Sequence, residues 1–323
     1  MSSEYGTRSS SSVAAPSTAN SIGGFGGIAQ DRVCFVCAGE LKLFGPYSRY
    51  AYYRCEKCGT LQLWPLPDEQ ELARAYETQY VAAAQSQEFT DPETWRKVSK
   101  TYCASLIQVL KDYHVVGPVV DYGAGWGIFV ELLNQNGFDA RGLEISQEEL
   151  AYAQGRGLPV QKGDLQSLQG ADGGLSAITL LAVFEHLVNH DAVLRSANRL
   201  LKPGGLFVTL HPTASFYNLV GNLARFGNKR KPVPDLWGSF TAPWHTALLS
   251  IEATEQLISR YGFRLLEIRP SPQGRLGGLL GLVQRALEFV NKIGWALLGK
   301  RWPLVTTHIF VFEKIGNPLS VAN

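Results

Sequence analysis

The stretch VVDYGAGWGIFVELL, from Val119 to Leu133, decides the fold of this chain. A short apolar run ends at Asp121, three glycines follow at alternate positions, and an apolar-rich stretch comes next. This order is typical of a buried strand, a tight turn and a helix. Glycine also lets the backbone of such a turn approach a ligand closely. The stretch therefore predicts a ligand-binding turn between a strand and a helix.

The same order of elements recurs along the rest of the chain. Further strands are expected at ARGLEIS, PVQKGD, AITLLAVF and LFVTLHP, separated by helices at QEELAYAQGRG and DAVLRSANRLLKPGG. Such alternation predicts βαβ units, in which helices cover both faces of a mostly parallel sheet. A final helix, IEATEQLISRYGF, precedes two last strands, RLLEIRP and THIFVFEK. We therefore expect an α/β, doubly wound domain over residues 118–323.

Four cysteines near the start of the chain form two C-x2-C pairs, Cys34 with Cys37 and Cys55 with Cys58. This spacing matches a four-thiolate zinc site, and two disulfides or unrelated buried thiols are the alternative. The small residues after each second cysteine suit turns whose backbone N–H groups point at sulfur. Four cysteines leave no open coordination position, so we predict a structural Zn²⁺ in a ribbon over residues 31–65.

The remaining regions and the composition set broader limits. Residues 1–30 are rich in Ser, Gly and Ala and lack the apolar segment of a secretory signal, so we predict a disordered tail and a cytoplasmic protein. Residues 66–117 are predicted as a helical linker or lid, with a helix start at Asp91 and Pro92. No apolar run reaches the roughly 18 residues that cross a bilayer. A net charge of +2 does not favour nucleic acid as a partner.

The glycine turn can be assigned to one of two ligand classes. Dinucleotides use G-x-G-x-x-G, whereas this turn is G-x-G-x-G and has Ile128 at the last position of the dinucleotide pattern. Glu144 closes the second strand, where a carboxylate can bind both ribose hydroxyls. Asp164 closes the third strand, where it and the next backbone N–H can meet an adenine edge. The turn itself holds no Lys or Arg for a phosphate, so an adenosine without a pyrophosphate fits better.

Five motifs in order, VVDYGAGWG, GLEIS, KGDL, AVFEHL and RLLKPGGLFVTLHP, resemble those of class I S-adenosylmethionine-dependent methyltransferases. The resemblance covers roughly residues 118–314. It implies a Rossmann-like fold with an antiparallel closing pair of strands, and S-adenosylmethionine as co-substrate. It also implies these roles: the methionine part held by Gly123, Gly125 and Gly127, the glycine loop and the ammonium group anchored by Asp121, the ribose held by Glu144, and the adenine held by Asp164 and Leu165.

The predicted zinc ribbon narrows the resemblance to a smaller group of methyltransferases. A ribbon followed by LPDEQELARAYETQY and such a core is similar to bacterial methyltransferases of sugar, polysaccharide and specialised-metabolite pathways, above all to sugar C-methyltransferases. Those enzymes have a His-Glu-His segment, of which this sequence matches only the last histidine, with His245. Their further C-terminal domain is not matched. The acceptor atom therefore stays open between carbon, oxygen and nitrogen. The predicted substrate is a small molecule, namely a sugar, a nucleotide-sugar or a glycosylated metabolite.

Three histidines are candidates for a base that removes a proton from the acceptor. The resemblance favours His245. His186 lies beside Glu185 after the fourth strand, where the pair can equally hold the loop, and His211 can cap the fifth strand. The insertion 212–247 contains aromatic and cationic residues and is predicted as the acceptor lid, with simple packing and a solvated NKRK loop as the alternative.

A late amphipathic helix, 276–298, is predicted to pack on the domain or on a partner. The cations and tryptophans within 276–302 would also suit contact with a membrane surface. The expected partners are thus the small-molecule acceptor, this surface, and a second copy of the chain. Two alternative functions remain: a membrane-associated quinone or lipid O-methyltransferase, and a methyltransferase that modifies nucleic acid with the ribbon as the reader. A non-catalytic scaffold that binds S-adenosylmethionine is a third.

Overall fold

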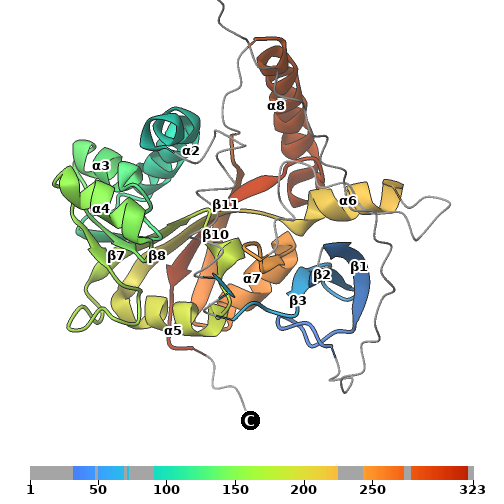
Figure 1. The fold of residues 1–323 in the computed structure, drawn as a ribbon, viewed down its shortest axis with the longest axis horizontal. Coiled ribbons are helices and arrows are strands. Elements are labelled where there is room, and N and C mark those ends of the chain that lie inside the picture. Colours follow the sequence, from blue (N-terminus) through green and yellow to red (C-terminus); the bar gives the residue numbers. More distant parts are fainter. Residues whose placement is uncertain are drawn as a thin grey trace, which may run out of the picture. The chain divides into compact units, whose positions relative to one another are not determined.

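The computed structural model describes residues 32–47, 50–68, 71–72, 91–224, 243–272 and 278–318 (Figure 1). The predicted tail, most of the linker before Asp91, and residues 225–242 of the predicted lid lie outside these ranges. Val33 to Asn323 belong to one compact unit. The ribbon and the sheet domain are therefore parts of the same unit.

In the described part of the chain the larger sheet has seven strands in the order β10-β11-β8-β7-β4-β5-β6. Neighbouring strands from β8 to β6 run parallel, and β11 runs antiparallel to both β8 and β10. This confirms the doubly wound sheet with its closing antiparallel pair. The strands are β4 (Pro118–Tyr122), β5 (Asp139–Glu144), β6 (Val160–Lys162), β7 (Leu175–Leu181), β8 (Leu201–Pro212), β10 (Phe263–Pro270) and β11 (Thr307–Lys314).

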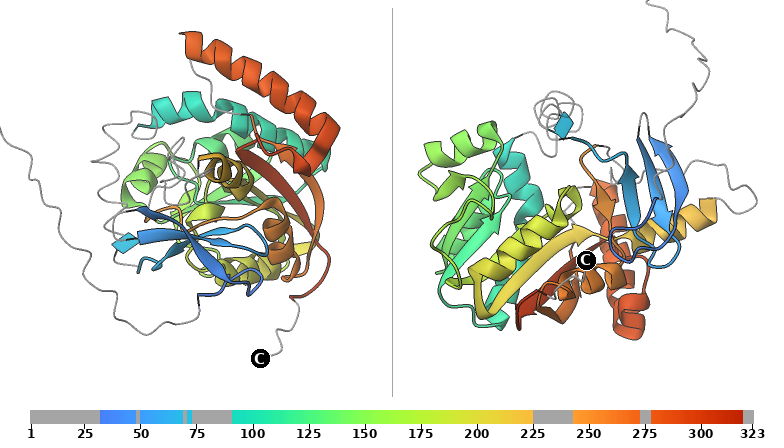
Figure 2. Two further views of the ribbon diagram at one scale, coloured as in Figure 1. Left: turned by 90° about the vertical axis from the view of Figure 1, so that its right-hand side faces the viewer. Right: turned by 90° about the horizontal axis from the view of Figure 1, so that it is seen from below.

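Helices cover both faces of this sheet (Figures 1 and 2). One apolar cluster joins the sheet to α2 (Pro92–Asp112), α3 (Ile128–Gln135) and α4 (Gln147–Gly155). A second cluster joins the other face to α5 (His190–Leu200) and α7 (Ile251–Ser259). The two clusters take alternate residues of β8, such as Phe207 and Val208, because side chains of a strand alternate between faces.

The start of α2 follows its sequence signals. The Asp91 side chain accepts hydrogen bonds from the backbone N–H groups of Glu93 and Thr94, and Pro92 takes the first helical position. Pro suits that position because the N–H it lacks would have no partner within the helix. The predicted helix start is confirmed.

Several predicted boundaries were wrong. The third strand, β6, ends at Lys162, so Asp164 lies in the loop beyond it. The strand predicted over AITLLAVF ends at Leu181, because Ala182 has a φ of +54° and turns the chain into a 3-10 helix, η2 (Phe184–His186). The helix predicted to run through KPGG ends at Leu200, and β8 begins at the next residue. Pro203 has no N–H for a helix, and Gly204 has a φ of +75°, so neither continues α5.

A smaller sheet contains the ribbon and one later segment. Its order is β1-β2-β3-β9, with β1 (Leu41–Tyr47), β2 (Tyr50–Cys55), β3 (Leu61–Trp64) and β9 (Ala247–Leu248). Ribbon residues Tyr52 and Leu63 share an apolar cluster with Phe216 and Tyr217 of α6 (Ala214–Ala224). For these two aromatics of the predicted lid, packing is therefore the observed role.

The core of the larger sheet contains two histidines. His211 on β8 pairs across the strands with His308 on β11, and the two are 1% and 0% exposed. The His211 ring lies 4.9 Å from the rings of both Phe184 and Phe310. Burial lowers the pKa of each histidine to about 3. Both imidazoles are therefore neutral wherever the fold is stable.

We expect His308→Gln to weaken the pH dependence of stability. An unfolded histidine binds a proton below about pH 6.5, whereas folded His308 stays neutral down to about pH 3. As the pH drops from about 6.5 to about 3, protonation of His308 in the unfolded chain should lower the free energy of unfolding. The decrease should reach up to about 1.4 kcal/mol per pH unit. Urea unfolding at several pH values measures the slope, which the glutamine variant should lessen. His114→Asn, at an exposed position, is the control, and equal slopes for all three proteins would refute the expectation.

Candidate active site and metal centre

The glycine turn between β4 and α3 needs glycine for two reasons. Gly123, Gly125 and Gly127 have φ values of +74°, +53° and +72°, in the region that side-chain-bearing residues avoid. A Cβ on Gly123 would also lie 2.5 Å from Val183, and one on Gly127 would lie 2.9 Å from Leu158. The turn is therefore tightly packed against Val183 beyond β7 and against Leu158 before β6.

Glu144 at the end of β5 points into this turn. Its carboxylate accepts hydrogen bonds, each of 2.7 Å, from the backbone N–H groups of Gly125, Ile145 and Ser146. The residue is 6% exposed. A carboxylate offers roughly four acceptor positions, so three are already used. A ribose would donate to the remaining position or take the place of the Gly125 N–H.

The other predicted cofactor residues lie nearby but make protein contacts. Asp121 is 1% exposed and accepts a hydrogen bond of 2.7 Å from the Thr179 hydroxyl, and burial raises the pKa of its carboxyl to about 8. The Asp164 carboxylate accepts from the Ser167 N–H at 2.8 Å. The Leu165 side chain is buried in the core. Their predicted contacts with the methionine and adenine parts stay predictions.

Three candidate catalytic residues meet just beyond β7. The rings of His186 and His245 lie 4.6 Å apart, and His186 Nε2 lies 3.9 Å from Glu185 Oε1. One ligand atom from each residue falls within 4.8 Å of the others. His186 Nδ1 lies 3.1 Å from the Trp244 carbonyl oxygen, to which it must donate, so Nε2 carries a lone pair toward Glu185.

Burial sets the protonation of this cluster. Glu185 is 2% exposed and, among the described residues, its Oε2 has no hydrogen-bond partner. Burial raises the pKa of Glu185 to about 8 and lowers the pKa of His186 well below its ordinary value. Near neutral pH the cluster therefore holds a protonated Glu185 and a neutral His186 ring beside His245. The same donor set, one carboxylate and two imidazoles, also suits a divalent cation.

Hydrogen bonds tie this cluster to the ribbon. The Tyr52 hydroxyl donates to the His245 carbonyl at 2.6 Å across a sequence separation of 193 residues. The Leu63 N–H donates to the Thr246 carbonyl at 2.8 Å, and the Thr246 N–H donates to the Glu185 carbonyl at 2.9 Å. Sequence reasoning missed Tyr52 and Thr246, because no short-range pattern marks contacts between such distant segments.

The third candidate base does not belong to the site. His211 lies in the core, and its Nε2 lies 3.4 Å from the Thr254 hydroxyl. An acceptor cannot reach an imidazole that is 1% exposed. His211 is therefore excluded as the base.

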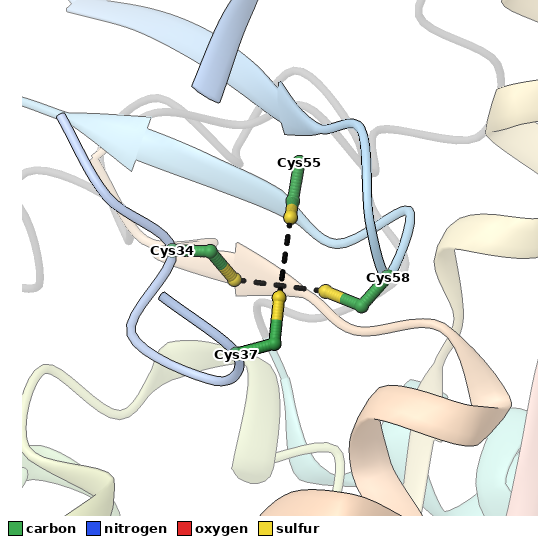
Figure 3. A group of neighbouring side chains, drawn as sticks. All are labelled: Cys34, Cys37, Cys55 and Cys58. Atoms are coloured by element: carbon green, nitrogen blue, oxygen red, sulfur yellow. Dashed lines mark hydrogen bonds between the residues drawn. The ribbon is translucent and has the colours of Figure 1, made fainter. Parts of the chain in front are cut away.

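The four cysteines of the ribbon converge on one point (Figure 3). The sulfurs of Cys34 and Cys58 lie 3.6 Å apart and those of Cys37 and Cys55 3.4 Å apart. These separations exclude disulfides, and the cysteines are free. They lie close to the roughly 3.8 Å between sulfurs of a tetrahedral zinc site with Zn–S bonds of about 2.3 Å.

The turns around the sulfurs also fit a metal. Backbone N–H groups of Val36, Cys37, Gly39 and Thr60 point at the cysteine sulfurs. A Cβ on Gly39 would lie 2.9 Å from the Cys55 sulfur and 3.3 Å from the Cys37 sulfur. Position 39 therefore requires glycine, as expected for a turn that encloses a metal. The donor set and geometry fit Zn²⁺.

Comparisons with known proteins identify the family of this chain. The methyltransferase domain family matches residues 94–268, more than half of the chain, so the chain belongs to that family. The ubiquinone biosynthesis O-methyltransferase of Methylococcus capsulatus is 33% identical over 109 residues, which cover 31% of this chain and 46% of that protein. The enzyme of the same name from Pseudomonas aeruginosa (strain UCBPP-PA14) is 29% identical over 114 residues, which cover 32% and 49%. The chain spans about half the length of these curated relatives.

One solved structure shows the same fold. A chain from the complex of the Haloferax volcanii Trm112 methyltransferase activator with a methyltransferase superposes with a TM-score of 0.50. It is 14% identical, and the match covers 78% of this chain and all of that one. An S-adenosylmethionine-dependent methyltransferase from Mesorhizobium loti reaches a TM-score of 0.45 at 16% identity, over 64% of this chain and 96% of that one.

We expect Glu144→Gln to weaken the binding of S-adenosylmethionine by about tenfold or more. The change removes the charge that would accept the ribose hydroxyls, and such charged hydrogen bonds contribute about 1.5–3 kcal/mol. Calorimetric titration measures the affinity. Glu148→Gln, four residues away on the exposed side of α4, is the matched control. Unchanged affinity in the Glu144 variant would show that the ribose lies elsewhere.

Proposed function

We propose that this protein is an S-adenosylmethionine-dependent methyltransferase that acts on a small molecule. The observation that carries the proposal is the position of the Glu185–His186–His245 cluster next to the glycine turn. Val183, two residues before Glu185, lies against Gly123. A methyl donor held by the turn and by Glu144 would therefore lie beside groups that can receive a proton.

The reaction is an in-line displacement at the methyl carbon of the sulfonium. The acceptor loses a proton to an imidazole, and the electron pair left on it attacks the methyl carbon. The carbon–sulfur bond breaks as the new bond forms, its electron pair stays on sulfur, and S-adenosylhomocysteine leaves. Because the donor is already activated, positioning of the acceptor supplies most of the rate, and the base adds about 10²–10⁴-fold.

His245 is our choice for the base. It is less buried than Glu185, so an acceptor can reach it. His186 packs edge-on against it and keeps a neutral ring, because burial holds the pKa of His186 low. Glu185 and His186 then position His245, and the neutral His186 ring does not compete with it for the proton.

The acceptor class that we propose is a sugar, a nucleotide-sugar or a glycosylated metabolite. Its support is the resemblance to sugar C-methyltransferases, in which a ribbon precedes a core of this kind and a histidine matches His245. A quinone or other lipid-type hydroxyl is the second candidate. Its support is the similarity to ubiquinone biosynthesis O-methyltransferases over 109 to 114 residues.

We further propose that the ribbon binds a structural Zn²⁺ and through it fixes the base. Cys34, Cys37, Cys55 and Cys58 would hold the ion, which supplies a rigid link between the two turns of the ribbon. Two ribbon groups, the Tyr52 hydroxyl and the Leu63 N–H, hold the His245–Thr246 segment. A ribbon ordered by the ion would therefore fix the position of His245 on the acceptor side of the site.

We expect His245→Asn to lower kcat by about 10²–10⁴-fold while the affinity for S-adenosylmethionine is retained, because the base is lost and the cofactor site is untouched. The assay incubates the zinc-loaded enzyme with S-adenosylmethionine and a pool of nucleotide-sugars, with a quinol pool run separately. Methylated products are identified by mass. His114→Asn is the control, and a His245 variant within a few-fold of the parent would refute the assignment.

Removal of the metal should lower kcat on the order of 10²-fold, since a shift of about 1 Å in a catalytic group has an effect of this size. The affinity for S-adenosylmethionine should stay nearly constant, because Glu144 and the glycine turn make no contact with the cysteines. A chelator followed by zinc readdition tests this, with Cys55→Ser as the variant and Cys103→Ala as the control. Full activity of the metal-free protein would contradict the role of the ribbon.

A further inference from the structure

The helix α8 (Gly278–Leu298) packs on the domain through one side only. The Trp302 indole N–H donates to the Asn291 side-chain oxygen at 2.9 Å, and its ring lies so close to Gly294 that an added Cβ would be 2.2 Å away. On the same side the Trp295 ring lies 5.3 Å from that of His308. Polar, small and aromatic residues therefore anchor this helix.

The opposite side of α8 carries large apolar residues that are exposed. They recur at helical spacing and form what we call the apolar face of α8: Leu282 (57% exposed), Phe289 (65%), Val290 (44%), Ile293 (46%) and Leu297 (77%). A surface helix normally turns its apolar stripe toward the core and its polar residues outward. In α8 the apolar residues point outward and the polar residues point toward the domain. This arrangement indicates that the apolar face binds a partner.

Charge indicates what that partner is. Arg285 and Lys292 are exposed and lie one turn from Phe289, at the edge of the apolar face. Arg301 follows in η3 (Gly299–Arg301), as does Lys300, whose Nζ lies 3.7 Å from the Glu255 carboxylate, and Glu288 is the one acidic residue from Gly278 to Arg301. Among the described residues, no carboxylate forms an ion pair with Arg285 or Lys292. A partner with negative charges around an apolar interior complements this arrangement.

The tryptophans do not form part of this face. From the sequence we expected Trp295 and Trp302 to suit contact with a membrane surface. In the structure both pack between α8 and the rest of the domain. Their role is to hold α8 in place. The apolar face is thus presented on a helix that is fixed at its back.

We propose that α8 lays its apolar face into the surface of a lipid bilayer that carries anionic headgroups. An interfacial helix has this composition: large apolar residues on one face and cations along its border. In the described part of the chain, no helix is long and apolar enough to cross a membrane, so α8 would lie in the plane of the surface. A second copy of the same face fits less well, since it offers Arg285 and Lys292 like charges. The contact does not depend on which acceptor is methylated.

Vesicle flotation of the zinc-loaded full chain tests the proposal. The protein should float with vesicles of phosphatidylcholine mixed with phosphatidylglycerol, and much less with phosphatidylcholine alone or at high salt. The double variant Phe289→Glu/Ile293→Glu should reduce the bound fraction by about tenfold or more, because two buried aromatic or aliphatic contacts are lost. Arg285→Glu/Lys292→Glu should remove the preference for the anionic vesicles.

A matched control separates this face from exposed apolar residues in general. Leu43→Glu/Val116→Glu makes the same charge change at positions that are 58% and 78% exposed, and it should float like the parent. Affinity for S-adenosylmethionine verifies that each variant is folded. If the glutamate pair at 289 and 293 fails that check, Phe289→Ser/Ile293→Ser takes its place.

Three results would overturn the proposal. The parent protein does not float with the anionic vesicles, or the variants at 289 and 293 float as well as the parent. In the third, light scattering finds a dimer that Phe289→Glu/Ile293→Glu converts to a monomer, without vesicle binding by the parent. That last result would assign the apolar face to a second copy of the chain.

Discussion

The backbone pairing between β3 and the segment that begins at His245 is the contact on which the acceptor side depends. Leu63 binds Thr246, and Thr246 binds the Glu185 carbonyl, so ribbon, late segment and η2 form one continuous hydrogen-bonded unit. Together with the contact between His186 Nδ1 and the Trp244 carbonyl, this pairing holds His245 beside His186. The ribbon is therefore joined to this cluster directly, because its strand β3 begins the series of contacts.

The two halves of the proposed site, its cofactor side and its acceptor side, depend on different physical constraints. The cofactor side is local: positive φ values at the glycines and the three N–H groups on Glu144 arise within about twenty residues of chain. The acceptor side is assembled from distant segments, and Glu185 is buried there with a raised pKa. A buried carboxyl without a full set of partners costs stability, which is typical of functional sites.

Much of the fold was predictable because its signals are short-range. The Asp91–Pro92 helix start, the glycine turn and the paired cysteines each depend on a few adjacent residues. The failures have an equally local cause. Leu181 to Phe184 are all apolar, so the sequence pattern does not show that Ala182 turns the chain out of the strand. Likewise the apolar residues at 200 and 201 conceal the change from α5 to β8.

By itself the sequence determined the alternating strands and helices, the ligand-binding turn and the cysteine set, since periodicity and spacing carry that information. Only the tertiary structure placed His245 beside Glu185 and His186 and removed His211 from consideration, because His211 is buried in the core and His245 is not. The tertiary structure also decided on which side of α8 the apolar face lies relative to the core. An amphipathic pattern shows that a helix has an apolar face, but packing decides whether that face meets the core or is left exposed, as it is here.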